Sequence, residues 1–224
     1  MKTILITGTS RGVGLELAKY YLHYYNVIGL DKSETGITNP DYKHIVVDLS
    51  RPEDILKIFK SIEKIDIVIN NAAVLTSQFA IRLPLEKAIE MIMVDFLGVF
   101  AVSREAVKRM DRGRIINISS MAVVLEPMGD SIYAGCKAAV KTMANVMAKE
   151  FSQQGITCNT IGITAIETDM LRQLPKDKID MIIAGLPVPR YARIEDIINV
   201  IDFFISDRSD YITAQTIYLG GIHD

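Results

Sequence analysis

The chain has 224 residues, enough to bury a substantial core, and its length favours a single domain spanning residues 1–224. Hydrophobic residues make up 49% of the sequence and the formal net charge is -2, which gives no sign of a nucleic-acid or anionic-membrane partner. The apolar run near Met1 is too short for a signal peptide and no segment is long enough to span a membrane, so we expect a cytoplasmic protein.

Short apolar runs alternate with helical patterns along the chain. Strands are predicted at residues 4–6, 27–30, 45–47, 65–69, 115–118, 156–161 and 216–219, and helices at residues 15–22, 52–62, 86–110, 131–151 and 194–205. Uniformly apolar strands that alternate with helices are typical of a parallel sheet covered on both faces. We therefore predict a doubly wound α/β fold, with its ligand crevice at the carboxyl ends of the strands.

A glycine-rich turn follows the first predicted strand. Gly8, Gly12 and Gly14 are spaced G-x-x-x-G-x-G, which lets the backbone bend sharply and approach a pyrophosphate at the start of the following helix. A tight turn without a ligand would use the same glycines. The position of this turn, after the first strand of an alternating chain, favours nucleotide binding.

Two carboxylates stand at the ends of the next two predicted strands. Asp31 lies roughly twenty residues beyond the glycine turn, where a carboxylate accepts hydrogen bonds from a ribose 2′-hydroxyl. A solvated turn would also carry such a residue. Asp48 is placed either to meet an adenine amine or to cap the helix that begins at Pro52.

The choice between NAD and NADP depends on Asp31 and Arg11. Arg11, inside the glycine turn, is able to pair with a 2′-phosphate. Asp31 would repel that phosphate by roughly 4 kcal/mol at about 4 Å and an effective dielectric of about 20. Because Arg11 moves into solvent more readily than Asp31 retreats from a strand end, NAD(H) is the predicted preference and NADP(H) the alternative.

Three polar residues gather around the fifth predicted strand and the helix after it. Ser120 follows the strand, and Tyr133 and Lys137 are four residues apart and so share one helix face. A nearby ammonium favours the phenolate of a tyrosine, and a serine hydroxyl stabilises a carbonyl or alkoxide oxygen. The trio suits interconversion of a carbonyl and an alcohol. The alternative is a surface Tyr–Lys pair after a serine-rich turn.

Other reactive side chains form no recognisable centre. His23, His44 and His223 are scattered through the sequence, so no metal site is predicted. Cys136 and Cys158 stand in apolar surroundings and are expected to be buried free thiols.

Thr7–Gly14, Asn70–Ala73, Ser120, Tyr133 and Lys137 together resemble the short-chain dehydrogenase/reductase family, and the resemblance runs along the whole chain. Within the family, the sequence is most similar to 3-oxoacyl-[acyl-carrier-protein] reductases. The resemblance implies a seven-stranded Rossmann fold that uses NAD(H) or NADP(H). It also implies that Tyr133 is the catalytic acid or base, that Lys137 binds the nicotinamide ribose and lowers the pKa of Tyr133, and that Ser120 orients the substrate oxygen.

The resemblance extends to the cofactor site. Asn71 is expected to lie against the adenosine ribose, and Thr168 against the nicotinamide carboxamide. The full set expected to bind the cofactor is Gly8, Ser10, Arg11, Gly12, Val13, Gly14, Asp31, Asp48, Leu49, Asn71, Ala72, Tyr133, Lys137 and Thr168.

A homodimer or homotetramer is also implied, because the long helices that contain Asp95 and Tyr133 commonly pair between subunits in this family. The second of these helices carries four small residues that would permit close approach, namely Ala134, Ala138, Ala144 and Ala148. The alternative is that this helix packs only on its own sheet.

The sequence departs from the family pattern at four places. Asp95 replaces an asparagine that is usually catalytic, and we place Asp95 in the catalytic set. Ala73 replaces a glycine, Ile163-Thr164 replaces Pro-Gly, and Ala214 replaces a glycine near the end of the chain. These departures bear on turnover and substrate geometry rather than on the fold.

We therefore expect an NAD(H)-dependent oxidoreductase that interconverts a ketone and a secondary alcohol, with Tyr133 as proton donor or acceptor. Two alternatives stay open: an NADPH-dependent 3-oxoacyl-thioester reductase, and a non-catalytic dinucleotide-binding regulatory protein. The substrate is expected to be a small molecule, which the sequence does not identify. Residues 171–193, which contain Pro175, Gly185 and Pro187, are expected to form a mobile lid over it.

Overall fold

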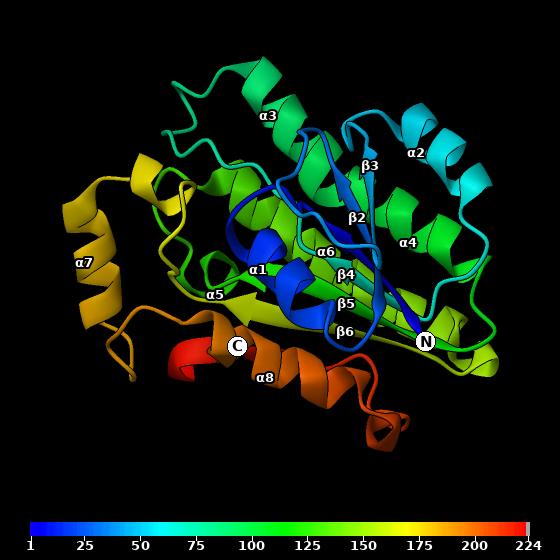
Figure 1. Cartoon of the computed structure of the whole chain (residues 1–224). Coiled ribbons are helices and arrows are strands. Elements are labelled where there is room, and N and C mark those ends of the chain that lie inside the picture. Colours follow the sequence, from blue (N-terminus) through cyan, green and yellow to red (C-terminus); the bar gives the residue numbers. More distant parts are fainter. Residues whose placement is uncertain (223–224) are drawn as a thin grey trace.

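A seven-stranded parallel sheet forms the centre of the computed structural model, which describes residues 1–222 (Figure 1). Its strands are β1 (Thr3–Thr7), β2 (Asn26–Asp31), β3 (Tyr42–Val46), β4 (Ile67–Asn70), β5 (Gly113–Ser120), β6 (Ile156–Ile163) and β7 (Thr216–Tyr218). They lie in the order β3-β2-β1-β4-β5-β6-β7, and all neighbours are parallel. The order reverses between β1 and β4, which places a crevice at the carboxyl ends of these strands. The predicted doubly wound α/β fold is confirmed.

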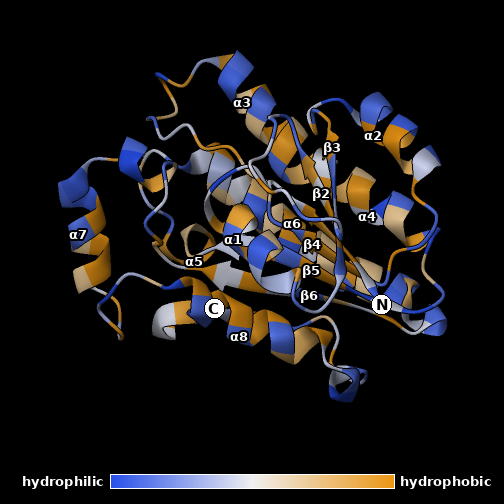
Figure 2. Cartoon of the chain, viewed as in Figure 1, coloured by the Kyte–Doolittle hydropathy of each residue, from blue (hydrophilic) through white to orange (hydrophobic). Residues whose placement is uncertain are grey.

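Helices cover both faces of the sheet. They are α1 (Gly12–Tyr21), α2 (Pro52–Ile58), α3 (Leu85–Ile92), α4 (Val99–Val107), α5 (Ala122–Leu125), α6 (Ser131–Glu150), α7 (Lys176–Ala184) and α8 (Ile194–Ile205). One core lies beneath α2, α4 and α6, and a second lies beneath α1 and α8. Successive strand residues point to opposite faces, so Leu5 enters the first core and Ile4 the second. Figure 2 shows hydrophobic strands in the middle and hydrophilic outer faces on the surrounding helices.

The helix predicted at residues 86–110 is three helical segments rather than one. α3 ends at Ile92, Met93–Gly98 form a π-helical segment, and α4 ends at Val107. A π segment adds a residue to a helical turn, which barely disturbs the spacing of apolar residues and therefore leaves little trace in the sequence. Asp95 lies inside this segment and is 0% exposed.

Two short helices lie where the sequence indicated no helix. α5 occupies the connection between β5 and α6, and α7 lies within residues 171–193, immediately after Pro175. α7 packs Ile179 and Ile183 against Ala165 of the segment that follows β6, with Met121 beside them. Figure 1 shows α7 at the left edge of the molecule, beyond the ends of the strands.

The alanines of α6 face two different environments. Ala144 and Ala148 are 0% and 1% exposed because they pack in the core beneath their own helix, so the expectation that they line a subunit interface is wrong. Ala134 and Ala138, nearer the start of the helix, are only half-buried.

Ala214 occupies a backbone conformation that suits the glycine expected there. Its φ angle is 57°, in the left-handed region, which costs a residue with a Cβ atom about 1 kcal/mol. The Ala214 amide donates to the carbonyl of Cys158 at 2.9 Å, and this contact holds the strained segment beside β6.

No helix within residues 1–222 is both long and apolar enough to cross a membrane.

Candidate active site

The glycine turn after β1 requires glycine at three positions, through backbone conformation or lack of space. Gly8 and Gly12 have φ angles of 78° and 57°, where residues with a Cβ atom are strained. At Gly14, a Cβ atom would lie 2.0 Å from the Gly8 carbonyl oxygen. Because α1 begins at Gly12, its free amides stand beside this open turn, and such an arrangement fits a pyrophosphate.

Asn71 fastens the end of β4 to the end of β1. Its Nδ2 donates to the Thr7 carbonyl at 2.9 Å, and its backbone amide donates to Thr7 Oγ1 at 3.0 Å. The amide of Ala72 donates to the same hydroxyl at 2.9 Å. Asn71 thereby fixes the conformation of the glycine turn. This structural role was not predicted from the sequence, which suggested only a contact with the adenosine ribose.

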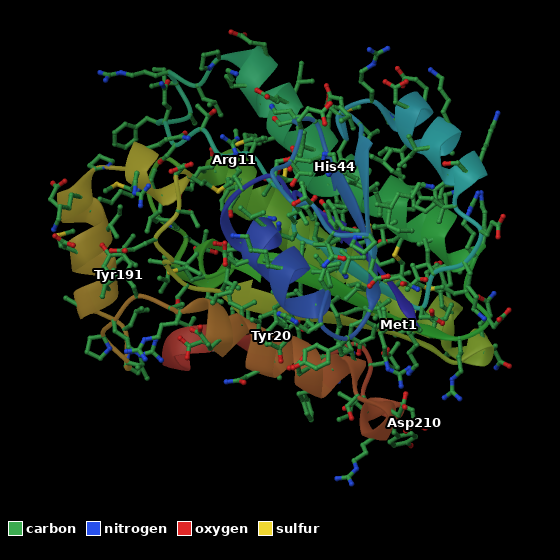
Figure 3. All side chains as sticks on the ribbon, viewed as in Figure 1. Met1, Arg11, Tyr20, His44, Tyr191 and Asp210 are labelled. Atoms are coloured by element: carbon green, nitrogen blue, oxygen red, sulfur yellow. The ribbon has the colours of Figure 1, made fainter. Side chains whose placement is uncertain are left out.

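Asp31 ends β2 beside the glycine turn, as predicted. Its carboxylate accepts from the amides of Ser10 and Ser33, each at 3.0 Å. Arg11 and Lys32 line the same part of the cavity, and neither forms an ion pair within residues 1–222. Figure 3 labels Arg11 and His44 in the upper part of the view, and the Nε2 atom of His44 donates to the Ser33 carbonyl at 2.9 Å.

Asp48 follows β3 and organises the turn before α2. Its Oδ1 accepts from the amide and the hydroxyl of Ser50, at 2.9 and 2.7 Å. The capping alternative is wrong, because the N-cap residue of α2 is Arg51 and no side chain caps this helix; Asp48 lines the cavity together with Leu49.

Ser120, Tyr133 and Lys137 come together at the ends of β5 and α6. Ser120 forms a side-chain hydrogen bond with Tyr133, and the Ser120 hydroxyl also accepts from the Ala122 amide at 3.1 Å. Lys137 is 2% exposed, and its Nζ lies 5.7 Å from the centre of the Tyr133 ring and donates to the Ile118 carbonyl at 3.0 Å. The predicted clustering of the three residues is confirmed.

The pKa of Tyr133 differs from the sequence-based expectation. Burial raises this pKa above its ordinary value, the negative charge of Asp95 raises it further, and the hydrogen bond from Ser120 opposes both. The expected lowering by Lys137 is therefore wrong for this state of the protein. Burial also lowers the pKa of Lys137, an effect that Asp95 opposes.

Asp95 reaches the same site from the π-helical segment. One carboxylate oxygen accepts from the Val74 amide at 2.8 Å, and the other is buried with no hydrogen-bond partner within residues 1–222. Burial raises the pKa of Asp95 to about 6, while the positive charge of Lys137 opposes this shift. A carboxyl group with this pKa changes its charge close to neutral pH.

One cavity of about 470 Å³ connects the glycine turn with Ser120, Tyr133 and Lys137. It runs from the glycine turn and Asp31, past Asn71, to Tyr133 and Lys137. The predicted site residues line it except Ser10, Gly14 and Asp95. Thr168 lies beside the glycine turn, where its Cγ2 would be 3.6 Å from a Cβ atom added at Gly12. An elongated ligand such as a dinucleotide fits a cavity of this shape and lining.

A polar group at the far end of the cavity was not predicted from the sequence. Lys178 of α7 donates to the Met128 carbonyl at 2.9 Å and to Ser77 Oγ at 3.2 Å, and it lies 3.6 Å from Asp130 Oδ1. Ser77 also donates to Asp130. The sequence identifies Asp130 as the residue before a helix, but it contains no pattern that predicts a contact between Asp130 and Lys178.

The remaining candidates lie outside this site. Cys136 and Cys158 are buried free thiols, as predicted, and burial raises their pKa values to about 11 and about 12. No group of His, Cys, Asp and Glu side chains able to hold a metal occurs in the part of the chain that the structure describes. His223 lies outside the described residues.

Comparison with known proteins adds sequence and structural relatives. Residues 15–223 match the family model described as enoyl-(acyl carrier protein) reductase. The chain is 32% identical to a 3-oxoacyl-[acyl-carrier-protein] reductase of Rickettsia bellii, covering 98% of this chain and 95% of the relative. It is 31% identical to the protein of the same name from Escherichia coli, covering 98% and 96%.

Solved structures show the same architecture. A short chain dehydrogenase family protein from Francisella tularensis superposes with a TM-score of 0.91 at 20% identity, covering 99% of this chain and 98% of that chain. A short chain dehydrogenase from Leptospira borgpetersenii, solved with bound NAD+, superposes with a TM-score of 0.89 at 25% identity, covering 98% and 91%.

Proposed function

Because this chain belongs to the short-chain dehydrogenase/reductase family, an oxidoreductase family, we propose that it interconverts a ketone and a secondary alcohol by hydride transfer, with Tyr133 moving the proton and NAD(H) as the preferred cofactor. The observation that carries this proposal is the meeting of Ser120, Tyr133 and Lys137 in the cavity that begins at the glycine turn. The test is loss of NADH absorbance on addition of ketones, with NADPH compared in parallel.

The residues of the cavity fit a nicotinamide dinucleotide. The glycine turn and the start of α1 would hold its pyrophosphate, Asp31 its adenosine ribose and Lys137 its nicotinamide ribose. When bound, the nicotinamide supplies or accepts the hydride. The protein's own contribution is to place the substrate carbonyl within reach of Ser120 and Tyr133.

Tyr133 is suited to donate a proton during ketone reduction. Its raised pKa keeps the hydroxyl protonated at neutral pH, so the proton is available to the substrate oxygen as negative charge develops there. The Ser120 hydroxyl would donate to the same oxygen and stabilise that charge. The buried Lys137 ammonium beside the ring would then stabilise the phenolate that is left.

Asp31 supports a preference for NAD(H). Its carboxylate is held by two backbone amides at the end of β2, so it has little freedom to withdraw from a 2′-phosphate. Arg11 and Lys32 line the cavity nearby and would attract such a phosphate. Repulsion by the fixed carboxylate outweighs attraction by these flexible, exposed cations, whose charge is screened by solvent.

Replacing Asp31 with serine is expected to raise the affinity for NADPH relative to NADH by at least about tenfold, which corresponds to about 1.4 kcal/mol. The serine hydroxyl would keep a hydrogen-bonding group for ribose, and loss of the carboxylate charge would leave Arg11 and Lys32 unopposed. Fluorescence titration with both cofactors measures the ratio of dissociation constants, with Asp41→Ser at an exposed loop position as control. Tighter binding of NADPH than NADH by the unmodified protein would contradict the proposed preference.

A second candidate is reduction of a 3-oxoacyl thioester with NADPH. The relatives from Rickettsia bellii and Escherichia coli that carry the name 3-oxoacyl-[acyl-carrier-protein] reductase favour it. Acetoacetyl-coenzyme A, tested with each cofactor beside simple ketones and sugars, distinguishes the two candidates.

The buried Asp95 is expected to reduce stability above acidic pH. Folding raises its pKa from 3.8 to about 6, so the ionised carboxyl is disfavoured in the folded state. Its destabilising effect is therefore absent below pH 3.8, grows as the pH rises through about 6 and is constant above that value. The full effect corresponds to about 3 kcal/mol.

Asp95→Asn should remove this effect. We expect the variant to exceed the wild type in free energy of unfolding by up to about 3 kcal/mol at pH 8, with the difference shrinking towards pH 4. Turnover should be equal or higher, without a step near pH 6. Urea unfolding and pH–rate profiles measure both, with Asp210→Asn at an exposed site as control. A folded variant that binds cofactor but is inactive would show that the carboxyl group has its own chemical role.

A homodimer or homotetramer is proposed from the exposed apolar side chains of α3 and α4. Leu85 and Ile89 are 78% and 59% exposed, and Phe100 on α4 is 42% exposed. Exposed apolar residues on adjoining helices are typical of a subunit interface. Sedimentation velocity of the purified protein measures the assembly.

A further inference from the structure

The cavity has an apolar end, which we call the lid side. It is formed by α5, the connection from α5 to α6, and the segment that contains α7. Its apolar lining residues are Met121, Leu125, Leu171, Leu174, Ile179 and Ile182. Several of them also form a separate small hydrophobic cluster that joins α7 to the rest of the protein. A substrate bound at Tyr133 therefore meets hydrocarbon on this side.

The charged groups of the lid side neutralise each other. Lys178 is the cation here, and its ammonium is shared between Asp130, the Ser77 hydroxyl and the Met128 carbonyl. Asp130 is 6% exposed and lies three residues before Tyr133. A buried carboxylate and an ammonium with three acceptors have little capacity left to bind a further ion.

Charged residues farther around the cavity wall are paired as well. Lys87 and Glu90 form an ion pair at 2.8 Å, and Asp169 pairs with Arg172 at 2.9 Å. Within residues 1–222, three cations that line the cavity form no ion pair. Lys137 lies beside Tyr133 and donates to the Ile118 carbonyl, whereas Arg11 and Lys32 stand at the opposite end, beside Asp31. A carboxylate or phosphate on the lid side would lose its hydration without gaining a free cation.

We propose that the substrate carbonyl carries an uncharged, aliphatic substituent, which binds on the lid side, and that Asp130 is a specificity-determining residue that excludes anionic substrates by holding Lys178. This inference rests on the proposed function, because it names the substrate class of the same site. Asp130 acts on selectivity through Lys178. Its negative charge also raises the pKa of Tyr133, which affects the neutral and the anionic substrate alike.

The test uses two probes that differ only in charge. 2-Octanone and 7-oxooctanoate have the same chain and the same position of the carbonyl, and a carboxylate replaces the terminal methyl in the second. Shorter pairs of the same design cover other distances between the carbonyl and Lys178. We expect the wild type to show a kcat/KM at least about 100-fold higher for the neutral member of the best pair.

Asp130→Asn should release Lys178 while keeping the size of the side chain. The ratio of kcat/KM for the neutral ketone to kcat/KM for the keto acid is expected to fall at least about tenfold, because kcat/KM for the keto acid rises. Asp130→Ser should change this ratio in the same direction. Adding Lys178→Met to Asp130→Asn should restore the preference, because the released cation is then absent. Asp180→Asn is the matched control, since it releases Lys176 on the exposed side of α7.

Binding measurements keep this inference separate from the proposed reaction. If neither ketone is reduced, the proposed function is in error, and calorimetric titration with 2-octanone and 7-oxooctanoate still measures the selectivity of the lid side. Equal or tighter binding of 7-oxooctanoate to the wild type, or an unchanged ratio in both Asp130 variants, would overturn the role of Asp130. A ratio that shifts in the Asp130 variants and not in Asp180→Asn supports it.

Discussion

Replacing Tyr133 with phenylalanine is expected to lower kcat by at least about 10³-fold while the dissociation constant for NADH changes less than about threefold. The substitution removes only the hydroxyl that hydrogen-bonds with Ser120, and the ring that packs over Lys137 remains. The Ser120 hydroxyl does not replace it, because an aliphatic alcohol is a much weaker acid than a phenol. Steady-state assays and fluorescence titration measure the two quantities.

Two comparisons make this result specific to Tyr133. Tyr211→Phe, at a position that is 99% exposed, should leave both quantities unchanged. An intact circular dichroism spectrum would show that Tyr133→Phe is folded. Full activity in the folded Tyr133→Phe protein would eliminate the proposed mechanism.

Replacing Lys137 with methionine is expected to impair cofactor binding and turnover together. The ammonium is buried, donates to the Ile118 carbonyl at 3.0 Å and lies beside the Tyr133 ring. Its loss would remove both the proposed charged donor to the ribose and the positive charge beside the ring. Loss of one charge-assisted hydrogen bond, about 1.5–3 kcal/mol, should weaken NADH binding by at least about tenfold. The kcat should fall by about 10²-fold or more.

The Lys137 variant also changes the environment of Asp95. Without the nearby positive charge, the pKa of Asp95 should rise above about 6, because burial is then opposed only by the hydrogen bond from Val74. Lys149→Met, on an exposed turn of the same helix, is the control. If cofactor affinity survives in Lys137→Met while turnover is lost, the ammonium acts on Tyr133 alone and does not bind ribose.

The fold was largely predictable because its signals are local. Uniformly apolar runs such as residues 115–118 predict buried parallel strands, and a glycine pattern directly after the first strand predicts a phosphate-binding turn. Tyr133 and Lys137 were paired correctly because a helix places residues four apart on one face. In each case, the relevant spacing is set by the geometry of a single element.

The sequence was less informative where burial decides the chemistry. The Tyr–Lys spacing suggested a lowered pKa for Tyr133, and the shift is upward because desolvation and the charge of Asp95 outweigh the hydrogen bond from Ser120. The pKa of Asp95 likewise depends on a π-helical segment that leaves its carboxyl group buried and one oxygen without a hydrogen-bond partner within residues 1–222. Burial is a property of the packed molecule, which spacing along one helix does not express.

By itself, then, the sequence determined the alternation of strands and helices, the glycine turn and the pairing of Tyr133 with Lys137, since these depend on near neighbours in the chain. Only the tertiary structure brought Ser77, Asp130 and Lys178 together at the end of the cavity. Their segments are far apart in the sequence and meet because α7 packs its apolar face against Ala165 and Met121. A contact of this kind depends on the path of the whole chain, so no local pattern of residues predicts it.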